Sequence, residues 1–308
     1  MKKKLLSLLL AAVMALAVLP ALAEADALTL TDMLGRTVTL AGPATRVVVL
    51  MPSDCEILYA IGAGDAVVGR GTYCNYPAEV ADIPEVNSGN ETNLEQILAL
   101  EPQVVVMTKM AQTEEQVAAL ENAGVAVLIT DAQSIADTYD CITLLGALTG
   151  KTEGAAAVIA DMQARLAAVA EQAQAAGKTV YFETTPLEYG WGLWSAGSGT
   201  FMDEIGQLCG LTNIFADQEG WPMVSEEEVI AADPDYIVTI EMYYGEGPTP
   251  VEVIASREGW KGMQAIQNGA IFNADNDQIT RPGPRLADAA EALLQFVLDL
   301  DAAQEPAA

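Results

Sequence analysis

The stretch from Gly150 to Ala176 has the composition of one long, uninterrupted helix. It is rich in Ala and in straight-chain residues, the strongest helix formers, and contains no Pro or Gly after Gly154. Its apolar residues recur at helical spacing: Val158, Met162, Leu166 and Val169. From Thr152 to Ala176 the helix would be roughly 37 Å long, about the width of a small domain. Either it joins two similar lobes, or it lies on the surface of one continuous α/β domain.

Strand and helix patterns alternate on both sides of that stretch. The strands are nearly continuous apolar runs, typical of parallel strands that helices cover on both faces. The clearest runs are residues 46–50, 103–108, 125–130, 178–183 and 236–240. The sequence therefore predicts an α/β protein: two Rossmann-like lobes with mostly parallel sheets, joined by one long α-helix. The expected boundaries are 24–150 for the N-terminal lobe, 151–177 for the connecting helix and 178–308 for the C-terminal lobe.

An internal repeat favours the two-lobe organisation. One segment reads NLEQILALEPQVVV, and a segment beyond the long helix reads VSEEEVIAADPDYIV. In each, an apolar strand follows a proline, and a glutamate stands seven residues before that proline: Glu95 before Pro102, and Glu227 before Pro234. Each segment is therefore predicted to be a helix, a stop at proline and a buried strand.

Residues 1–23 have the three parts of a secretory signal peptide. Three lysines at positions 2–4 precede the apolar run LLSLLLAAVMALAVL, and Ala21-Leu22-Ala23 is a small-x-small cleavage site. The apolar run is too short for a comfortable transmembrane span. We expect cleavage after Ala23 and export to a periplasmic or extracellular location. Because no cysteine precedes Cys55, a lipoprotein anchor at the cleavage site is not expected.

Charge and the absence of histidine exclude several classes of function. The formal net charge is −29, and it becomes more negative once the signal-peptide lysines are removed. Nucleic acids and anionic membranes both need a basic surface, so neither is an expected partner. The chain has no His, which excludes Ser-His-Asp and Cys-His catalysis and His-ligated haem. No catalytic residue, metal ligand or cofactor is predicted.

The four cysteines are too scattered for a disulfide scaffold or for the CxxC spacing of a zinc site: Cys55, Cys74, Cys141 and Cys209. Cys55 and Cys74 both fall near strand ends of the first lobe. In an exported protein these two could pair, and free buried thiols are an equally consistent interpretation.

The residues that follow each predicted strand indicate a binding site. In parallel sheets, ligands bind beyond the carboxyl ends of the strands, and aromatic walls with a few polar groups suit a bulky, partly apolar ligand. The alternative is that these aromatics cap the core or stiffen loops. The predicted contact residues are Tyr73, Tyr76, Lys109, Trp191, Trp194, Tyr243, Tyr244 and Arg281. Ser53, Asp54, Asn75, Met110 and Arg285 also follow strands.

Arg281 and Arg285 could clamp a carboxylate, a phosphate or the oxygens of a chelate. The alternative for Arg285 is a local salt bridge with Asp288, three residues on. Of the two arginines, Arg281 is the expected contact. The acidic segment 275–277 lacks the Gly and the distal Glu of a calcium-binding loop, so a turn is predicted there.

Glu95 and Glu227 occupy the first turns of their predicted helices, where the helix dipole favours acids. The flanking residues Asn93 with Gln96, and Ser225 with Glu228, fit the N-cap and N3 positions of capping boxes. From the residues alone, solvated acids at helix starts are the favoured interpretation.

In order along the chain, these segments resemble the substrate-binding proteins of ABC importers for iron-siderophores, haem and cobalamin. The resemblance covers nearly all of the mature chain. The motifs that carry it are Asp32-x-x-Gly-Arg-x-Val38, Arg46-Val-Val, Glu56-Ile-Leu-Tyr-Ala-Ile-Gly-Ala-Gly64, Asn93-Leu-Glu95, Glu101-Pro-x-Val-Val, Trp260 before Ala265-Ile, and Arg281-Pro-Gly-Pro-Arg285.

The resemblance implies a monomer whose two lobes close little, because a continuous helix resists bending. It also implies that one acid on each lobe, here Glu95 and Glu227, docks onto arginines of a dimeric membrane permease. An iron-siderophore is the first expectation for the ligand and cobalamin the second, while haem would need a tyrosine as its axial ligand. A chelatase-like enzyme and a ligand sensor are the alternatives from other functional classes.

Overall fold

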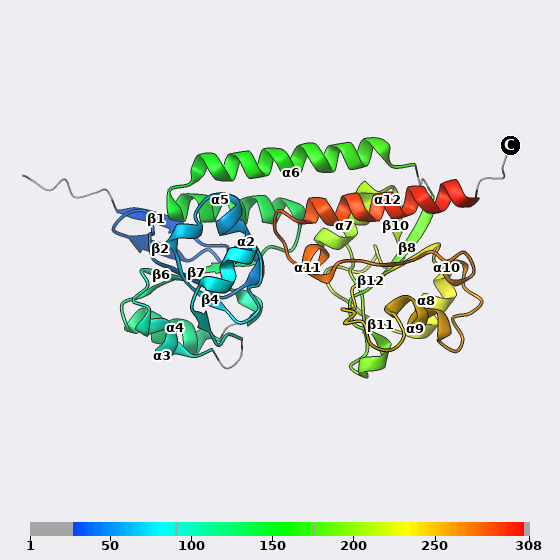
Figure 1. Ribbon diagram of the computed structural model, residues 1–308, viewed down its shortest axis with the longest axis horizontal. Coiled ribbons are helices and arrows are strands. Elements are labelled where there is room, and N and C mark those ends of the chain that lie inside the picture. The colour runs from blue at the N-terminus through cyan, green and yellow to red at the C-terminus, as the bar shows by residue number, and fades with distance from the viewer. Residues whose placement is uncertain (1–26, 90–91, 112, 175–176, 305–308) are drawn as a thin grey trace, which may run out of the picture.

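The computed structural model describes residues 27–89, 92–111, 113–174 and 177–304, which form two lobes lying side by side beneath long helices (Figure 1). The predicted signal peptide, residues 1–23, lies outside the described residues. Within the part of the chain that the structure describes, no helix combines the length and the apolar character that crossing a membrane requires.

The predicted long helix is present as α6, Thr152–Gln172. It ends at Gln172 rather than at Ala176, because Ala173 adopts an extended conformation. Three of the four residues of the predicted apolar stripe are buried, Met162, Leu166 and Val169, together with Ala155, whereas Val158 is only partly buried. The helix packs on α5 (Ile135–Thr149) of the first lobe and on α12 (Leu286–Gln304) of the second (Figure 1). One unbroken helix therefore spans both lobes.

The N-terminal lobe is built on a five-stranded sheet in the order β5-β4-β3-β6-β7, with every neighbouring pair parallel. An antiparallel hairpin of β1 and β2 precedes it. The elements are β1 (Leu28–Thr31), β2 (Thr37–Leu40), β3 (Val47–Val49), α2 (Pro52–Ala60), β4 (Val67–Gly71), β5 (Glu85–Val86), α3 (Leu94–Ala99), β6 (Val104–Thr108), α4 (Glu114–Asn122), β7 (Ala126–Thr130) and α5.

The C-terminal lobe repeats this plan with a four-stranded parallel sheet in the order β10-β8-β12-β13. A separate two-stranded ribbon pairs β9 with β11. The elements are β8 (Lys178–Glu183), β9 (Leu193–Trp194), α7 (Phe201–Leu208), β10 (Leu211–Asn213), β11 (Met223–Val224), α8 (Glu226–Ala232), β12 (Tyr236–Thr239), α9 (Pro250–Ser256), α10 (Gln264–Gln267), β13 (Ile271–Asn273), α11 (Asn276–Ile279) and α12.

The internal repeat is visible in the backbone. Helix α3 leads to β6, and helix α8 leads to β12, at the same position in the two sheets. The residue before each repeated proline lies in the left-handed region, with φ of 48° at Glu101 and 45° at Asp233. Proline disfavours the right-handed helical conformation for the residue before it, so both helices stop at this point. The two lobes therefore reuse one helix–proline–strand unit.

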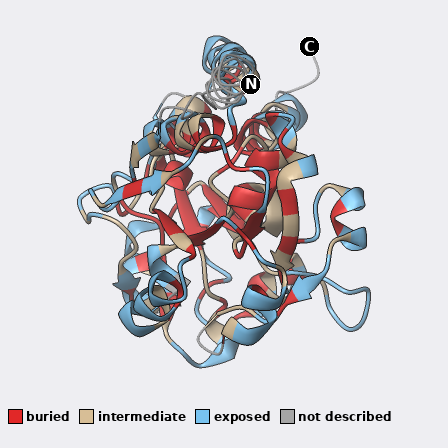
Figure 2. Cartoon of the chain, turned by 90° about the vertical axis from the view of Figure 1, so that its left-hand side faces the viewer, coloured by how far each residue is buried: buried red, intermediate tan, exposed pale blue. Residues whose placement is uncertain are grey.

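Both faces of the N-terminal sheet are buried, as the continuous apolar strands predict (Figure 2). Along β3, Val47 and Val49 belong to a large apolar cluster that includes the inner face of α6 and continues into the second lobe. Val48 points to the opposite face, where it belongs to a second cluster with Leu120 of α4. A strand that is apolar at every position is thus explained by helices on both sides.

The sequence did not predict the short elements of the second lobe. These elements are helices α9, α10 and α11 and the β9–β11 ribbon. Asn276 and Asp277 of α11 fall in a predicted turn, and Val224 of β11 falls in the repeated segment that is predicted to begin a helix. Each of these elements has between two and seven residues, which is too short for a helical or alternating apolar period to emerge.

Candidate functional site

A cleft of about 520 Å³ lies between the two lobes. The first lobe lines it mainly with residues from the start of α2, the loop after β4 and the ends of β6 and β7; the second lobe contributes α7, the loop before β11 and the segment after α11. The lining is mostly apolar, hydroxyl or amide in character. Asp54 and Arg281 are the charged side chains among the described residues that line it.

The cleft sits where parallel sheets usually bind ligands, beyond the carboxyl ends of the strands. Leu50 to Asp54 follow β3, Thr108 ends β6 and Thr130 ends β7. Across the cleft, Thr184 follows β8 and Ile240 follows β12. The equivalent edges of the two sheets therefore face one another across the cleft.

Asp54 is a buried carboxyl at the wall of this cleft. One of its oxygens accepts a hydrogen bond from the Thr130 hydroxyl at 2.9 Å, and the other lies 3.5 Å from the Cys141 thiol. Burial raises the pKa of Asp54 to about 6, although both hydrogen bonds favour the ionised form. Asp54 therefore changes charge within the pH range that an extracytoplasmic protein meets.

Direct contacts across one side of the cleft join the two lobes. The indole N–H of Trp221 donates to the side-chain oxygen of Gln133 at 2.9 Å, and the backbone N–H of Phe201 donates to the Gln133 carbonyl at 2.8 Å. The rings of Phe201 and Trp221 stack edge to face with centroids 5.4 Å apart. Gln133, between β7 and α5, is thus fixed by two groups of the other lobe.

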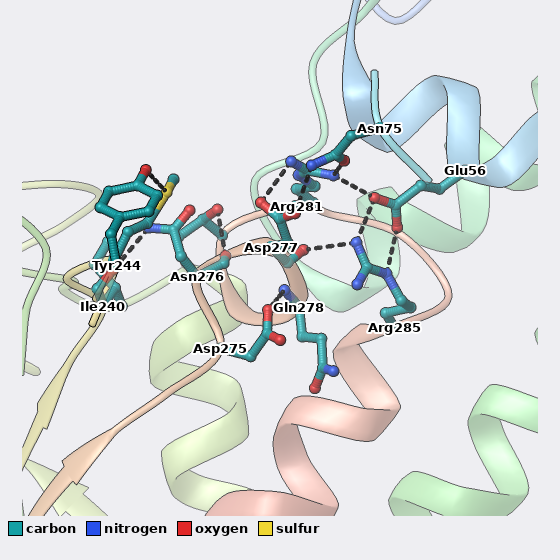
Figure 3. Close-up of polar contacts among 12 residues, drawn as sticks. Glu56, Asn75, Ile240, Tyr244, Asp275, Asn276, Asp277, Gln278, Arg281 and Arg285 are labelled. Carbon is teal, nitrogen blue, oxygen red and sulfur yellow. Dashed lines mark hydrogen bonds and ion pairs between the residues drawn. The ribbon is translucent and has the colours of Figure 1, made fainter. Parts of the chain in front are cut away.

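A second set of contacts between the lobes is ionic (Figure 3). Glu56 of α2 has a side chain that is only 2% exposed, and it accepts from Arg281 at 2.8 Å and from Arg285 at 2.8 and 2.6 Å. Arg281 also donates to Asn75 at 2.7 Å and to Asp277 at 2.5 Å. We call these five residues the inter-lobe ion cluster. It satisfies both arginines with partners from the protein.

The inter-lobe ion cluster separates the cleft from a second cavity of about 920 Å³ on the flank of the first lobe. Arg285 lies over the Tyr76 ring with its guanidinium carbon 4.2 Å from the ring centroid, a cation–π geometry. Tyr76, Arg285 and Glu56 line this flank cavity, whereas Arg281 lines the cleft.

The structure brings two of the predicted contact residues, Tyr73 and Arg281, to the wall of the cleft. Tyr76 instead lines the flank cavity. Lys109 does not line the cleft, and its ammonium group lies 2.9 Å from Asp131. The alternative for Arg285, a local salt bridge with Asp288, does not form, because Arg285 binds Glu56 and Asp288 pairs with Arg165 of α6.

The remaining predicted aromatics lie outside the lining of the cleft. Trp194 is part of β9, and the ring of Trp191 contacts that of Tyr189 with centroids 5.9 Å apart. The Tyr243 hydroxyl donates to the Gly247 carbonyl at 3.3 Å, and Tyr244 is largely exposed. In Figure 3 Tyr244 lies beside Ile240, apart from the ion cluster. These four positions stay predictions.

Several residues that line the cleft were not predicted, notably Gln133, Phe201, Met202 and Trp221. Gln133 stands three residues after the predicted strand 125–130, as Ser53 does after 46–50, so the same rule could have selected it. The other three do not follow a predicted strand. Phe201 and Met202 begin α7, and their N-cap Thr200 accepts a hydrogen bond from the backbone of Asp203. The sequence predicts a helix over residues 198–208, and Thr200 as an N-cap residue marks its start, but neither pattern indicates that its first turn faces the opposite lobe.

The acidic segment 275–277, predicted as a turn, begins the short helix α11. Asp275 caps α11, and Asp277 belongs to the inter-lobe ion cluster. Among the described residues, no group of three or more His, Cys, Asp or Glu side chains is placed to hold a metal ion.

Glu95 and Glu227 are both exposed, on α3 and α8 respectively. Both helices lie on the side of the molecule away from α6 (Figure 1). Ser225 and Glu228 form the predicted capping box at α8. At α3 the Asn93 cap is present, but the Gln96 side chain accepts from the Asn87 backbone. Neither Glu95 nor Glu227 forms an ion pair with another described residue.

Comparison with known proteins agrees with this geometry. A family model described as periplasmic binding protein matches residues 47–278. The chain belongs to the periplasmic binding protein family. An uncharacterized ABC transporter substrate-binding lipoprotein, YvrC of Bacillus subtilis, is 31% identical over 281 residues, covering 89% of this chain and 86% of the relative. This periplasmic binding protein is thus the substrate-binding component of an ABC transporter, as the sequence predicts.

Two further relatives describe the range of this family. The vitamin B12-binding protein of Salmonella typhimurium is 31% identical over 253 residues, covering 81% of this chain and 89% of the relative. The crystal structure of a possible iron-binding periplasmic solute-binding protein from Staphylococcus epidermidis superposes with a TM-score of 0.70 at 28% identity, covering 82% of this chain and 98% of the other. These relatives are binding proteins, and the two-lobe α/β fold is the predicted one.

Proposed function

We propose that this periplasmic binding protein carries a bulky, nearly neutral chelate with amide or hydroxyl groups, and that a corrinoid of the vitamin B12 type fits best. The observation behind this choice is the charge of the cleft. Among the described residues that line it, the one cation is Arg281, which is already neutralised by Glu56 and Asp277. An anionic ligand would therefore find no unshared positive charge among the described lining residues, and Asp54 would repel it when ionised.

The polar lining suits hydrogen bonding to neutral groups. Hydroxyl and amide side chains from both lobes surround apolar walls, which is the composition that orients a large, partly apolar ligand. The polar members of the lining are Ser53, Ser88, Thr108, Thr130, Gln133, Thr184 and Thr280. A corrinoid presents amides at its rim and a flat apolar surface. The similarity to a vitamin B12-binding protein supports the same ligand class.

A neutral ferric hydroxamate is the second candidate. The same cleft accepts it for the same electrostatic reason, and the similarity to a possible iron-binding protein of Staphylococcus epidermidis favours it. A ferric catecholate or haem would bring negative charge into a cleft whose cation is already paired. The order of these candidates therefore differs from the order expected from the sequence, where a siderophore came first.

Isothermal titration of the mature protein with cyanocobalamin, a ferric hydroxamate, a ferric catecholate and hemin tests this proposal. We expect one-to-one binding of cyanocobalamin and weaker or no binding of the catecholate and hemin. Tyr73→Ala, in the cleft lining, should weaken binding, and Tyr244→Ala, outside it, should not. Tight binding of the ferric catecholate with none of cyanocobalamin would overturn the charge argument.

We also propose that the protein is a monomer without catalytic activity, that its signal peptide is cleaved after Ala23, and that Glu95 and Glu227 dock onto the permease. Exposed acids at equivalent positions of the two lobes suit a two-fold symmetric partner. Reversing both charges, Glu95→Arg with Glu227→Arg, should abolish ligand uptake by cells.

Ligand affinity of that double variant should match the wild type, because both positions lie outside the cleft. The matched control reverses two exposed acids of α6, Glu153→Arg with Glu171→Arg, and should leave uptake intact. Equal loss of uptake in both double variants would contradict the assignment, since it would indicate a response to net charge. Mass spectrometry of the exported chain tests cleavage after Ala23.

A further inference from the structure

Two cysteines of the first lobe are neighbours in space. Cys55 lies in the first turn of α2, which follows β3, and Cys74 lies in the loop that follows β4. Because β3 and β4 are adjacent parallel strands, the segments that leave their carboxyl ends run close together. Both thiols are buried, with 0% and 1% of each residue exposed.

The neighbouring Cys74 side chain, together with burial, raises the pKa of Cys55, in agreement with the closeness of the two segments. The Cys74 sulfur also lies 3.9 Å from the Val49 carbonyl at the end of β3. The other two cysteines have different partners: Cys141 lies against Asp54, and Cys209 lies 3.5 Å from the Ala290 carbonyl. Cys55 and Cys74 therefore form the one neighbouring pair among the described cysteines.

We propose that Cys55 and Cys74 form a disulfide bond when the protein folds outside the cytoplasm. Exported proteins fold in an oxidising compartment, where adjacent thiols are converted to disulfides. Both thiols are reduced in the structure.

The reaction is a thiol–disulfide exchange with an external disulfide, carried by an oxidoreductase or a small molecule. The thiolate of one cysteine attacks the external disulfide and releases one external thiolate. The thiolate of the second cysteine then attacks the mixed disulfide and releases the other. One S–S bond forms in the protein and one is broken in the oxidant. The protein loses two protons and two electrons, and the oxidant gains the electrons as two thiols. Because the folded thiols are buried, the exchange takes place during folding.

The bond would join the two segments of the N-terminal lobe that contribute to the inter-lobe ion cluster. Cys55 stands directly before Glu56, the acceptor of the inter-lobe ion cluster. Cys74 stands directly before Asn75, which donates to Asp277 and accepts from Arg281. Tyr73, on the other side of Cys74, lines the cleft. A disulfide here would tie the loop after β4 to α2. It would also hold Glu56 and Asn75, the two residues that the first lobe contributes to the inter-lobe ion cluster, in fixed positions relative to each other.

Peptide mapping of the protein recovered from outside the cytoplasm tests the proposal directly. The protein is alkylated in denaturant without reductant and digested with trypsin, which leaves each cysteine on its own peptide: 47–70, 71–109, 110–151 and 179–257. We expect a linked species of 47–70 with 71–109, lighter by two hydrogen atoms than the sum of the two thiol peptides. Cys141 and Cys209 should be alkylated. Alkylation of all four cysteines, or a link between any other pair, would overturn the proposal.

Thermal unfolding gives a second, independent readout. We expect that wild type reduced in denaturant and refolded with reductant melts about 5 °C below the oxidised protein. Cys209→Ala should show the same difference, whereas Cys55→Ser with Cys74→Ser should show none. An equal Tm for oxidised and reduced wild type would contradict the proposal. If the double serine variant does not fold, the difference in Tm between oxidised and reduced wild type still tests the proposal.

Discussion

The two lobes share one plan but neutralise their buried glutamates in different ways. Glu183 ends β8, and Glu56 lies in the helix that follows β3, the strand equivalent to β8. Both side chains are almost completely buried, 0% and 2% exposed. Glu183 binds Arg257 of its own lobe, while Glu56 binds two arginines of the other lobe.

The difference separates two uses of a buried ion pair. In the second lobe, Arg257 holds Glu183 and Glu188 together and packs over the Trp260 ring at 4.6 Å, so the network stabilises that lobe alone. In the inter-lobe ion cluster, the same chemistry fixes how the lobes face each other. A buried charge is costly without its partner. Removal of either pair should therefore show which property of the protein depends on it.

The largest effect is expected from Arg257→Met. It leaves Glu183 buried without its cation, which costs about 3–5 kcal/mol of folding free energy. Chemical denaturation followed by circular dichroism measures the loss. Arg257→Met combined with Glu183→Leu should recover most of it, because two well-packed apolar residues replace the pair. If the double variant is no more stable than the single one, the loss comes from packing against Trp260 rather than from charge.

Asp54 is a third buried carboxyl, and its described hydrogen-bond partners are Thr130 and Cys141 rather than an arginine. Burial raises its pKa from 3.8 to about 6. A raised pKa in the folded state means that Asp54 contributes stability while it is protonated, below pH 4, and loses it as the pH rises through 6. The loss should reach roughly 2–3 kcal/mol.

Asp54→Asn removes this titration. Denaturation midpoints at pH 4, 5, 6 and 7.5 should therefore show a smaller fall in stability with rising pH for the variant than for the wild type. Asp277→Asn, in the inter-lobe ion cluster, serves as the comparison, because its carboxyl is balanced by Arg281. Identical pH profiles for wild type and Asp54→Asn would show that Asp54 keeps an ordinary pKa.

A smaller loss of stability, about 1–2 kcal/mol, is expected from Glu56→Gln, because both arginines keep other partners in the cluster. Its main effect should be on lobe orientation. Hydrogen exchange should become faster in residues 71–77 and 277–285, where the cluster joins the lobes. Glu79→Gln, an exposed acid at the flank cavity, is the matched control and should change neither. Unchanged hydrogen exchange in Glu56→Gln would show that Glu56 does not fix how the lobes face each other. Its ion pairs would then not differ in role from the Arg257–Glu183 pair.

The sequence predicts those parts of the fold that depend on local patterns. The long helix, the apolar strands and the capping box at Ser225 each follow from a period or a spacing within a few residues. The repeated prolines, Pro102 and Pro234, predict where both helices stop, and the structure adds that the residue before each is left-handed. Residue types predict the end of a helix less well than they predict its presence. Helix-forming residues continue to Ala176 in the sequence, but α6 ends at Gln172.

The cleft itself is less predictable, because its contacts join residues far apart in the chain. Arg285 pairs with Glu56, which is 229 residues away in the chain, rather than with Asp288, which is three residues away. The rule that ligand contacts follow strands selects Tyr73 correctly for the lining, but it also selects Trp191 and Trp194, whose segment pairs with β11. It omits Trp221, which reaches the cleft from the loop that leads into β11. A single sequence carries no signal for such pairings.

The central claim, that the cleft between the lobes holds the ligand, is tested most directly by blocking it. Ala132 lines the cleft and Ala119 is an exposed residue of α4, so Ala132→Trp and Ala119→Trp add the same volume at two places. Isothermal titration should use whichever chelate of the panel binds the wild type most tightly. We predict at least about a tenfold loss of affinity, 1.4 kcal/mol, in Ala132→Trp and none in Ala119→Trp. Equal affinity in all three proteins would contradict the account.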